Sequence, residues 1–457
     1  MNKRTLNVKP GRRVMHERAA PLAERAGGRG GDGGVGGVGG VGGVGGAGGA
    51  RTVVAPEHAE VPLGEYMQRR ERVLKALGKS AALVMAGSEG GEDFVVNAFF
   101  QHLTGITNES GAMLLFDPTN DDPRKRVILF LRPLNPEADR WDGLRDHLSG
   151  ALRARLGFRT VLRTTQMPMW LSYAARRCKS LACLHPFAQH TQGVTEDLAT
   201  YRKVAERVVG VQIEDRTDVL PRMRAAKSRT ELTLIQHAID ITREGFLSAM
   251  RTLGPGVGEA RVQQAIEQAY AAHGGEGLAF DSIVGSGLNA TVLHYHKNRD
   301  ATSEGELVVI DSGAKFGGYC ADISRTLPVS GRFTKQQCAI YDVVLMAQEA
   351  AIAACRPGAS FWEIDAAARS VIENADLGDF FIHGIGHHLG LEVHDTDPRT
   401  PLEPGAVVTI EPGVYIPEQK LGIRIEDDVL ITSRGRQVLS ESISKTTSEI
   451  ERVMGER

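Results

Sequence analysis

Apolar positions in the first half of the chain repeat with spacings typical of both helices and buried strands. Residues 63–77 carry apolar side chains at helical spacing among Arg and Glu, which predicts an amphipathic helix. Residues 81–86 and 127–131 are short apolar runs that predict buried strands. Strands and helices alternate in this way to about residue 210. The pattern predicts a small α/β domain over residues 55–215.

The second half of the chain predicts long helices segregated from several strands. Residues 229–253 and 257–273 read as long helices, and capping boxes at Thr334 and Ser360 predict two more, which end near residues 355 and 374. Strand-like apolar runs cover residues 306–311, 318–328, 406–411 and 422–432. This arrangement predicts an α+β domain over residues 216–457.

The first 54 residues differ in composition from the rest of the chain. They are basic at the start and continue into a Gly-Gly-Val near-repeat over residues 27–50. Collagen requires glycine once every three residues together with abundant proline, whereas this tract has two glycines in three and no proline. We therefore predict a disordered, flexible segment over residues 1–54.

Charge and cysteine content narrow the class of protein. The 54 Lys and Arg residues nearly cancel the 56 Asp and Glu residues, which gives no electrostatic support for nucleic acid or an anionic membrane as the partner. No apolar run has the length that a membrane span requires. The five cysteines are odd in number and lack CxxC spacing, so a reducing compartment, the cytoplasm, is expected.

Four acids lie at the polar end or on one face of apolar strands in the second half. Asp311 ends one strand, and Asp322 follows it beyond a Gly-Gly turn, so the two acids are expected to face each other across a hairpin. Glu411 ends another strand, and strand alternation in residues 424–428 places Arg424, Glu426 and Asp428 on one face. Converging carboxylates repel one another unless cations neutralise them.

A histidine-rich loop accompanies these acids in the predicted α+β domain. The segment His383-Gly-Ile-Gly-His387-His388 lacks the glutamate of a zinc HExxH helix, and its two glycines disfavour a helix. A single strand-end acid is more often a cap, and a single histidine is more often structural. The combination of four acids with this loop favours a metal site, and oxygen ligands with one imidazole favour Mn²⁺, Co²⁺ or Zn²⁺ pairs.

The motifs together resemble the five metal-binding segments of the pita-bread metallopeptidases. They are residues 310–313, 322–326, 383–387, 410–413 and 424–428, in the family's order. Residues 283–287, which lead to His294, resemble the family's upstream histidine segment. Within the family the chain is most similar to the aminopeptidase P branch, over about residues 60–452. Residues 100–105 and 223–228 belong to that similarity.

The resemblance implies a role for each matching residue. Asp311 would bind one metal ion, Asp322 and Glu426 would bridge both ions, and His387 and Glu411 would complete the second site. Glu411 would also shuttle a proton. His294 and His394 would hold the substrate and stabilise the intermediate, and Arg424 would orient a bridging carboxylate. His383 and Tyr415 would line a proline pocket.

The implied activity is a metal-dependent aminopeptidase that releases the N-terminal residue from peptides with proline in second position. A hydroxide that bridges two divalent ions, Mn²⁺ or alternatively Co²⁺ or Zn²⁺, would be the nucleophile. The resemblance also implies a dimer or tetramer. A prolidase that acts on Xaa-Pro dipeptides shares these motifs and stays open as the alternative. A non-catalytic pita-bread binding module is disfavoured because all five ligand positions are intact, which also counts against a creatinase.

Overall fold

The computed structural model describes residues 60–456, apart from residues 88–93, 138–139, 141–144, 189 and 192. The segment 1–54, for which the sequence predicts disorder, lies outside the described residues.

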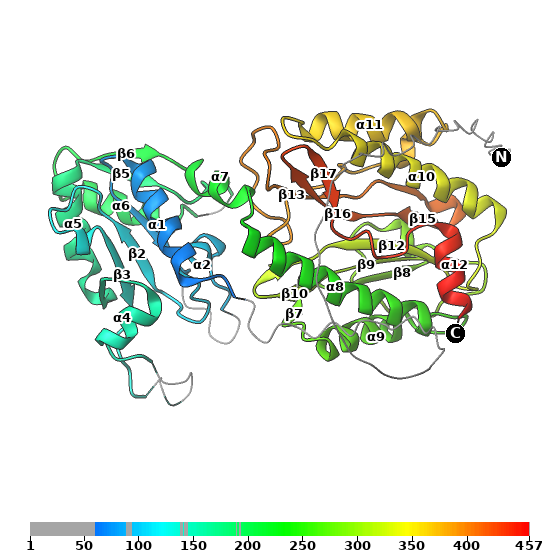
Figure 1. Ribbon diagram of the computed structural model, residues 1–457, viewed down its shortest axis with the longest axis horizontal. Helices are drawn as coiled ribbons and strands as arrows, with labels where there is room; N and C mark the ends of the chain where they lie inside the picture. The colour runs from blue at the N-terminus through cyan, green and yellow to red at the C-terminus, as the bar shows by residue number, and fades with distance from the viewer. Residues whose placement is uncertain are drawn as a thin grey trace, which may run out of the picture. The chain divides into compact units, whose positions relative to one another are not determined.

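The N-terminal part of the described chain alternates strands with helices, as the sequence pattern predicts (Figure 1). Its elements are α1 (Leu63–Leu77), β1 (Ala82–Met85), α2 (Ala98–Thr104), β2 (Met113–Phe116), β3 (Val127–Leu131), α4 (Gly150–Leu156), β4 (Thr160–Arg163), α5 (Met167–Cys178), β5 (Ser180–Cys183), α6 (Glu196–Ala205) and β6 (Gln212–Asp215). Strands β1 to β4 form one sheet in sequence order, in which only β3 and β4 are parallel.

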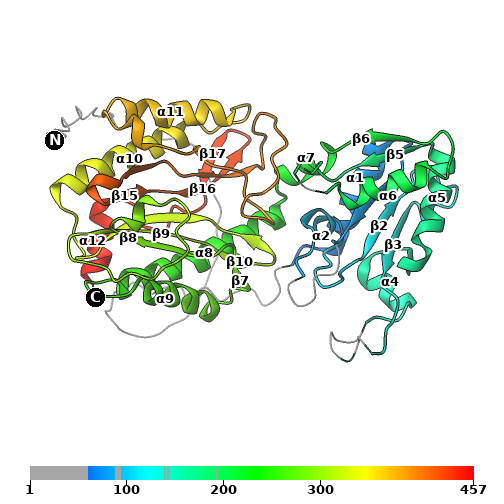
Figure 2. The same ribbon diagram turned by 180° about the vertical axis from the view of Figure 1, so that it is seen from behind.

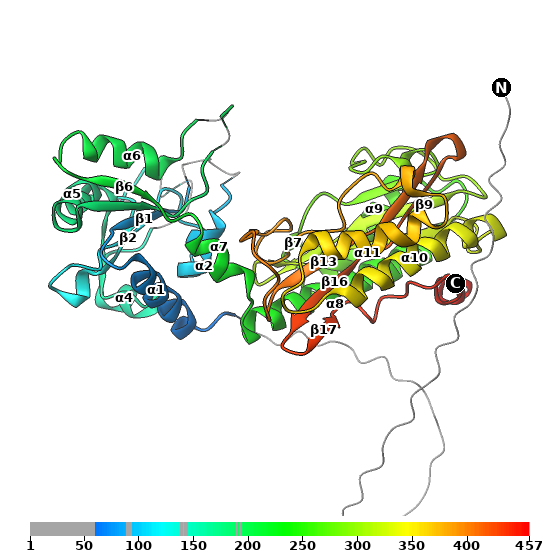
Figure 3. The same ribbon diagram turned by 90° about the horizontal axis from the view of Figure 1, so that it is seen from above.

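Both faces of this sheet are covered, which explains why its strands are continuous apolar runs rather than alternating ones. In β1, Ala82 and Val84 pack in one apolar cluster with Val73 and Leu77 of α1. The intervening Leu83 packs in a second cluster with side chains of α5 and α6. Figure 3 shows α1 and α4 on one side of the sheet and α5 and α6 on the other.

Helix α7 (Val219–Ala225) leads into the C-terminal part, where long helices pack against several short antiparallel sheets. The elements are α8 (Arg229–Thr252), α9 (Glu259–Ala272), β7 (Gly277–Leu278), β8 (Ile283–Ser286), β9 (Leu307–Ser312), β10 (Ala314–Phe316), β11 (Tyr319–Cys320), β12 (Ile323–Pro328), α10 (Lys335–Ala354), α11 (Phe361–Glu373), β13 (Val407–Ile410), β14 (Gly413–Ile416), β15 (Leu421–Arg424), β16 (Asp427–Thr432), β17 (Gly435–Val438) and α12 (Thr447–Gly455). Helices α8 and α9 lie together on one side of the strands, and α10 and α11 lie together on the other (Figures 1 and 2).

The predicted helix starts are confirmed because the side chains close real capping boxes. Ser228, Thr334 and Ser360 each accept a hydrogen bond from the backbone of the third helical residue, whose side chain binds back to the cap. One large apolar cluster then joins these helices to the strands beneath them. The α+β class is therefore confirmed. Over the described residues, no helix is both long and apolar enough to cross a membrane.

Candidate metal centre

Two long antiparallel hairpins build the floor of the site, and each is interrupted where it carries an acid. In the first hairpin, β9 pairs with β12 and β10 pairs with β11 in a single register. That register places Gly313 opposite Asp322 at the interruption. A Cβ atom at Gly313 would lie 1.8 Å from the carbonyl oxygen of Ala321, so only glycine permits this close approach. The predicted hairpin is confirmed, but the predicted strand over residues 318–328 breaks at residues 321–322, and the direct partner of Asp311 is Ser324.

The second hairpin repeats this design. Strand β13 pairs with β16, and β14 pairs with β15, again in one register that would place Glu411 opposite Glu426. Pro412 follows Glu411 and has no N–H to donate, so the ladder opens there. The sequence predicted one continuous strand over residues 422–432, and this is wrong: the strand breaks at residues 425–426.

The histidine loop runs along the outer edge of β13, without helical structure, as predicted. The backbone N–H of Thr409 donates to the carbonyl of His387 (2.9 Å), and that of Glu411 donates to Ile385 (2.9 Å). Gly386 allows this approach, because a Cβ atom there would lie 2.0 Å from the carbonyl oxygen of Thr409. The loop is therefore fixed in register beside Glu411.

These elements surround a cavity of about 520 Å³. All five predicted metal ligands line it, together with three of the predicted substrate residues and Arg424: Asp311, Asp322, His387, Glu411, Glu426, His294, His383 and His394. Asp428, which strand alternation placed on the same face, is instead fully buried, and its carboxylate accepts a hydrogen bond from the backbone N–H of Asp322 (3.3 Å).

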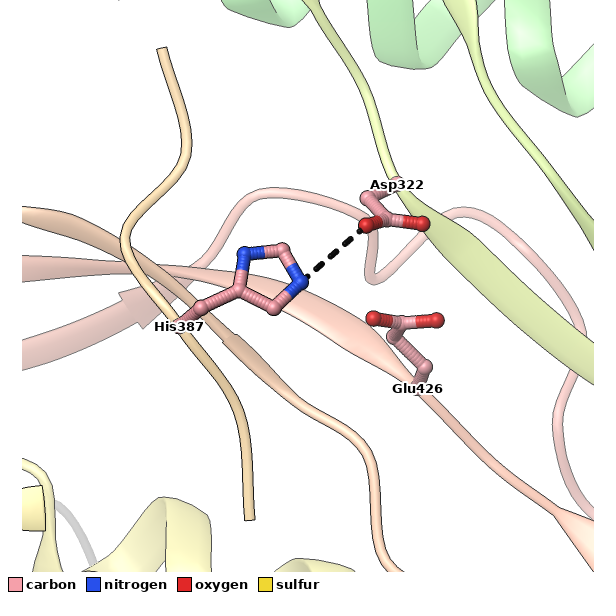
Figure 4. Close-up of side chains that lie close together, drawn as sticks. All are labelled: Asp322, His387 and Glu426. Carbon is pink, nitrogen blue, oxygen red and sulfur yellow. Dashed lines mark ion pairs between the residues drawn. The ribbon is translucent and has the colours of Figure 1, made fainter. Parts of the chain in front are cut away.

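Three of the predicted ligands form a tight group. One donor atom each from Asp322, His387 and Glu426 lies within 4.8 Å of the other two, and Figure 4 shows the three side chains pointing toward one another. The Nε2 atom of His387 is 3.4 Å from Asp322 Oδ2 and 3.6 Å from Glu411 Oε1. Asp311 is held by Arg424, whose Nη2 lies 2.7 Å from its Oδ2.

The buried carboxylates of the cavity repel one another, which favours the binding of cations. Burial, followed by repulsion from Asp311 and Glu411, raises the pKa of Asp322 well above its usual range. Burial and repulsion from Asp322 and Glu411 do the same to the pKa of Glu426. Asp311 Oδ1 and Glu426 Oε2 are buried without any hydrogen-bond partner. Buried acceptors of this kind fit divalent cations, which would pair the orphan oxygens and relieve the repulsion.

Arg424 connects the acids to the remaining predicted residues. Its guanidinium donates to Ser324 Oγ (2.7 Å), to Asp311 and to the Tyr415 hydroxyl (3.1 Å). The Tyr415 hydroxyl lies 2.9 Å from Nε2 of His383. Tyr415 is buried and, unlike His383, does not line the cavity. Burial, together with the charge of Arg424, lowers the pKa of His383 to about 4, so that ring is neutral at neutral pH.

The other two histidines stand at the cavity wall. The ring of His394 packs edge-on against His387, with 4.2 Å between the ring centroids. Burial and the neighbouring His387 lower the pKa of His394. His294 stacks on His296 at 6.2 Å, and His296 also lines the cavity.

Two features of the site were missed in the sequence. The first is an apolar wall formed by Phe280, Ile283, Leu293 and Val393. Leu293 and Val393 each directly precede a predicted substrate histidine, and this adjacency could have predicted that they line the cavity.

The second missed feature is the fully buried Arg325, which donates to the carbonyl of Glu426 and to Asp427 (2.8 Å). Its partners are remote in sequence, so no local pattern reveals them.

Comparison with known families assigns this fold and its acid-rich cavity to a class of metallopeptidases. Residues 233–433 match the model of "Metallopeptidase family M24", and residues 66–182 match "Aminopeptidase P, N-terminal domain". The chain belongs to metallopeptidase family M24 and has the two-part architecture of the aminopeptidases P.

Individual relatives cover nearly the whole described chain. A Xaa-Pro aminopeptidase of Haemophilus influenzae is 32% identical, over 87% of this chain and 98% of its own. The solved structure of a putative aminopeptidase P from Bacillus anthracis superimposes with a TM-score of 0.80 at 30% identity, over 87% of this chain and 99% of its own. Zinc-substituted Escherichia coli aminopeptidase P in complex with product gives a TM-score of 0.78 at 29% identity, with the same two coverages.

Proposed function

We propose that the protein removes the N-terminal residue from peptides whose second residue is proline, by metal-dependent hydrolysis. The observation that carries the proposal is the cavity in which Asp322, His387 and Glu426 converge beside orphan carboxylate oxygens. The similarity to Xaa-Pro aminopeptidases over nearly the full described chain supports the substrate class.

The proposed ligands are the five groups predicted from the sequence: Asp311, Asp322, His387, Glu411 and Glu426. Their oxygen-rich donor set with one imidazole suits two divalent ions, Mn²⁺ first, with Co²⁺ or Zn²⁺ as alternatives. When bound, such a pair lowers the pKa of a water molecule and polarises the scissile carbonyl. Arg424 contacts Asp311 at 2.7 Å, so we propose that it orients this ligand of one ion rather than the bridging carboxylate that the resemblance implies.

The chain's own residues would then bind the substrate and transfer the proton. An Xaa-Pro bond is a tertiary amide without an N–H, so its nitrogen must receive a proton as the bond breaks. Glu411 stands at the cavity beside His387 and is the proposed proton shuttle to that nitrogen. His294 and His394 donate hydrogen bonds to the substrate and to the developing oxyanion.

The proline ring requires an apolar, size-limited surface. Phe280, Leu293 and Val393 supply that surface, and the neutral ring of His383 closes it. Tyr415, which the resemblance implies as a residue of the proline pocket, is proposed to act through His383, because its hydroxyl lies 2.9 Å from Nε2 of that imidazole and orients it.

Localisation and assembly complete the proposal. All five cysteines are free thiols in the structure, which suits a reducing compartment such as the cytoplasm. The expectation of a dimer or tetramer rests on the family resemblance alone.

The test offers the Mn²⁺-loaded protein an Xaa-Pro-Xaa tripeptide and an Xaa-Pro dipeptide, with Asp322→Ala as the inactive control. We expect cleavage of the tripeptide by the wild type and not by the control. Cleavage of the dipeptide alone would identify a prolidase. Cleavage of neither peptide, with metal bound, would refute the proposed substrate class.

A further inference from the structure

A buried group of charges lies next to the cavity without belonging to the proposed chemistry. Asp395 is only 7% exposed, and its carboxylate contacts two cationic side chains that are also buried. Lys227 Nζ lies 3.0 Å from Asp395 Oδ2, and Arg224 donates to Asp395 Oδ1. Arg224 also donates to the exposed Glu392 (2.9 Å). One buried carboxylate is thus held by two buried cations, an arrangement that is stable only while all partners are present.

Asp395 directly follows His394, so its position determines the path of the chain at that histidine. The backbone N–H of Asp395 donates to the carbonyl of His388 (2.8 Å), which ties it to the histidine loop. Gly390 leaves room for the carboxylate, because a Cβ atom there would lie 2.2 Å from Asp395 Oδ2. The carbonyl of Gly390 accepts from Cys320 (2.9 Å), two residues before Asp322.

Both cations come from the segment that joins the two parts of the described chain. Arg224 belongs to α7, and its guanidinium packs over the ring of Phe99 in α2, 4.8 Å from the centroid. Lys227 precedes the cap of α8, and its backbone N–H donates to the carbonyl of Gly405 (2.8 Å). The segment is therefore held by contacts with Asp395, Phe99 and Gly405.

We propose that Arg224 and Lys227 are positioning residues, which hold Asp395 so that the adjacent His394 presents its imidazole to the substrate. The connecting segment thereby sets the geometry of a substrate-binding group in the cavity. The proposal rests on the role of His394 in the proposed function, whereas the contacts that carry it do not depend on that role.

A double-mutant cycle separates positioning from general stability. The variants are Lys227→Met, His394→Ala and the double variant, compared through kcat/KM on an Xaa-Pro-Xaa tripeptide. A misplaced catalytic or binding group commonly costs about 10-fold to 100-fold, so we expect Lys227→Met to lower kcat/KM by that factor. In the His394→Ala background its effect should shrink to less than about twofold. Lys227→Arg, which keeps the charge, should restore most of the activity.

A second measurement is independent of activity. Histidines labelled with ¹³C at Cε1 give one NMR signal per ring, and the signal lost in His394→Ala assigns His394. We expect this signal to shift or broaden in Lys227→Met and in Gly390→Ala, which displaces the same carboxylate sterically. Arg70→Gln is the matched control, because it removes another buried guanidinium, one that binds the carbonyls of Leu103 and Gly157. It should lower thermal stability without moving the His394 signal or kcat/KM.

Three outcomes would overturn the proposal. The first is an equal effect of Lys227→Met in both backgrounds, and the second is an unchanged His394 signal in both Lys227→Met and Gly390→Ala. The third is a change of kcat/KM or of the His394 signal in the Arg70→Gln control equal to that in Lys227→Met. If His394→Ala itself leaves kcat/KM unchanged, the proposed role of His394 has failed, and the NMR signal alone then decides the positioning.

Discussion

Arg325 and Asp427 form a buried ion pair whose removal should destabilise the protein strongly. Both side chains are fully buried. All five N–H groups of Arg325 are used: four donate to the backbone carbonyls of Ser324, Glu426, Ile443 and Ser444, and one donates to Asp427. Asp427→Asn would remove the carboxylate with which this buried guanidinium forms its ion pair.

The expected cost follows from that burial. Removing one partner of a buried pair costs about 3–5 kcal/mol, because the other charge stays buried without compensation. In a domain of this size 1 kcal/mol corresponds to about 2–4 °C in Tm, so Asp427→Asn should lower Tm by about 6 °C to about 20 °C. Burial alone would raise the pKa of Asp427, but Arg325 and Lys445 hold this pKa below its usual range. Asp427 is therefore ionised at neutral pH, and Asp427→Asn should have its full effect there.

Differential scanning calorimetry on metal-free protein measures the effect without a contribution from metal binding. The control is Arg452→Gln, which breaks an exposed pair with Glu456 at 3.0 Å and should shift Tm little. Equal shifts in Asp427→Asn and Arg452→Gln would refute the reasoning, since burial would then contribute nothing to the cost.

Three further predictions concern the loop, a buried histidine and the N-terminal segment. Gly386→Ala should push the loop away from Thr409 and displace His387, so calorimetric titration should show weaker metal binding; unchanged affinity would contradict the close approach at that glycine. Burial and the charges of Arg69 and Arg224 lower the pKa of His102 well below its usual value, so below about pH 6.5 only the unfolded state takes up its proton. Relative to His102→Phe, the wild type should therefore lose up to about 2 kcal/mol of unfolding free energy between pH 8 and pH 5 in denaturant titrations, and parallel pH profiles would exclude this. Deletion of residues 1–54 should leave kcat unchanged, and a large fall in kcat would show that the segment contributes to catalysis.

Local patterns predicted most of the fold because local forces determine it. Capping side chains determine where α8, α10 and α11 begin, and the Gly-Gly turn at residues 317–318 closes the first hairpin. The break at residues 425–426 escaped prediction because its cause, Pro412, lies across the ladder rather than beside it in sequence.

The candidate site was predictable to the same extent. The acids at strand ends and the glycine-separated histidines are local signals, and they converge in one cavity. The family resemblance placed Tyr415 in the substrate pocket, but its burial and its contact with His383 depend on three-dimensional packing. The Asp427 and Asp395 ion pairs join residues that are 102 and 168 positions from Arg325 and Lys227, respectively, so no sequence window contains them.

We propose that the cavity binds two divalent metal ions through the converging acids and His387. The most direct test is the metal content of protein dialysed against Mn²⁺, for the wild type and for Glu426→Gln, measured by inductively coupled plasma mass spectrometry. We predict two ions per chain in the wild type and a clear loss in the variant. Wild-type protein without bound metal, or an unchanged stoichiometry in Glu426→Gln, would contradict the claim.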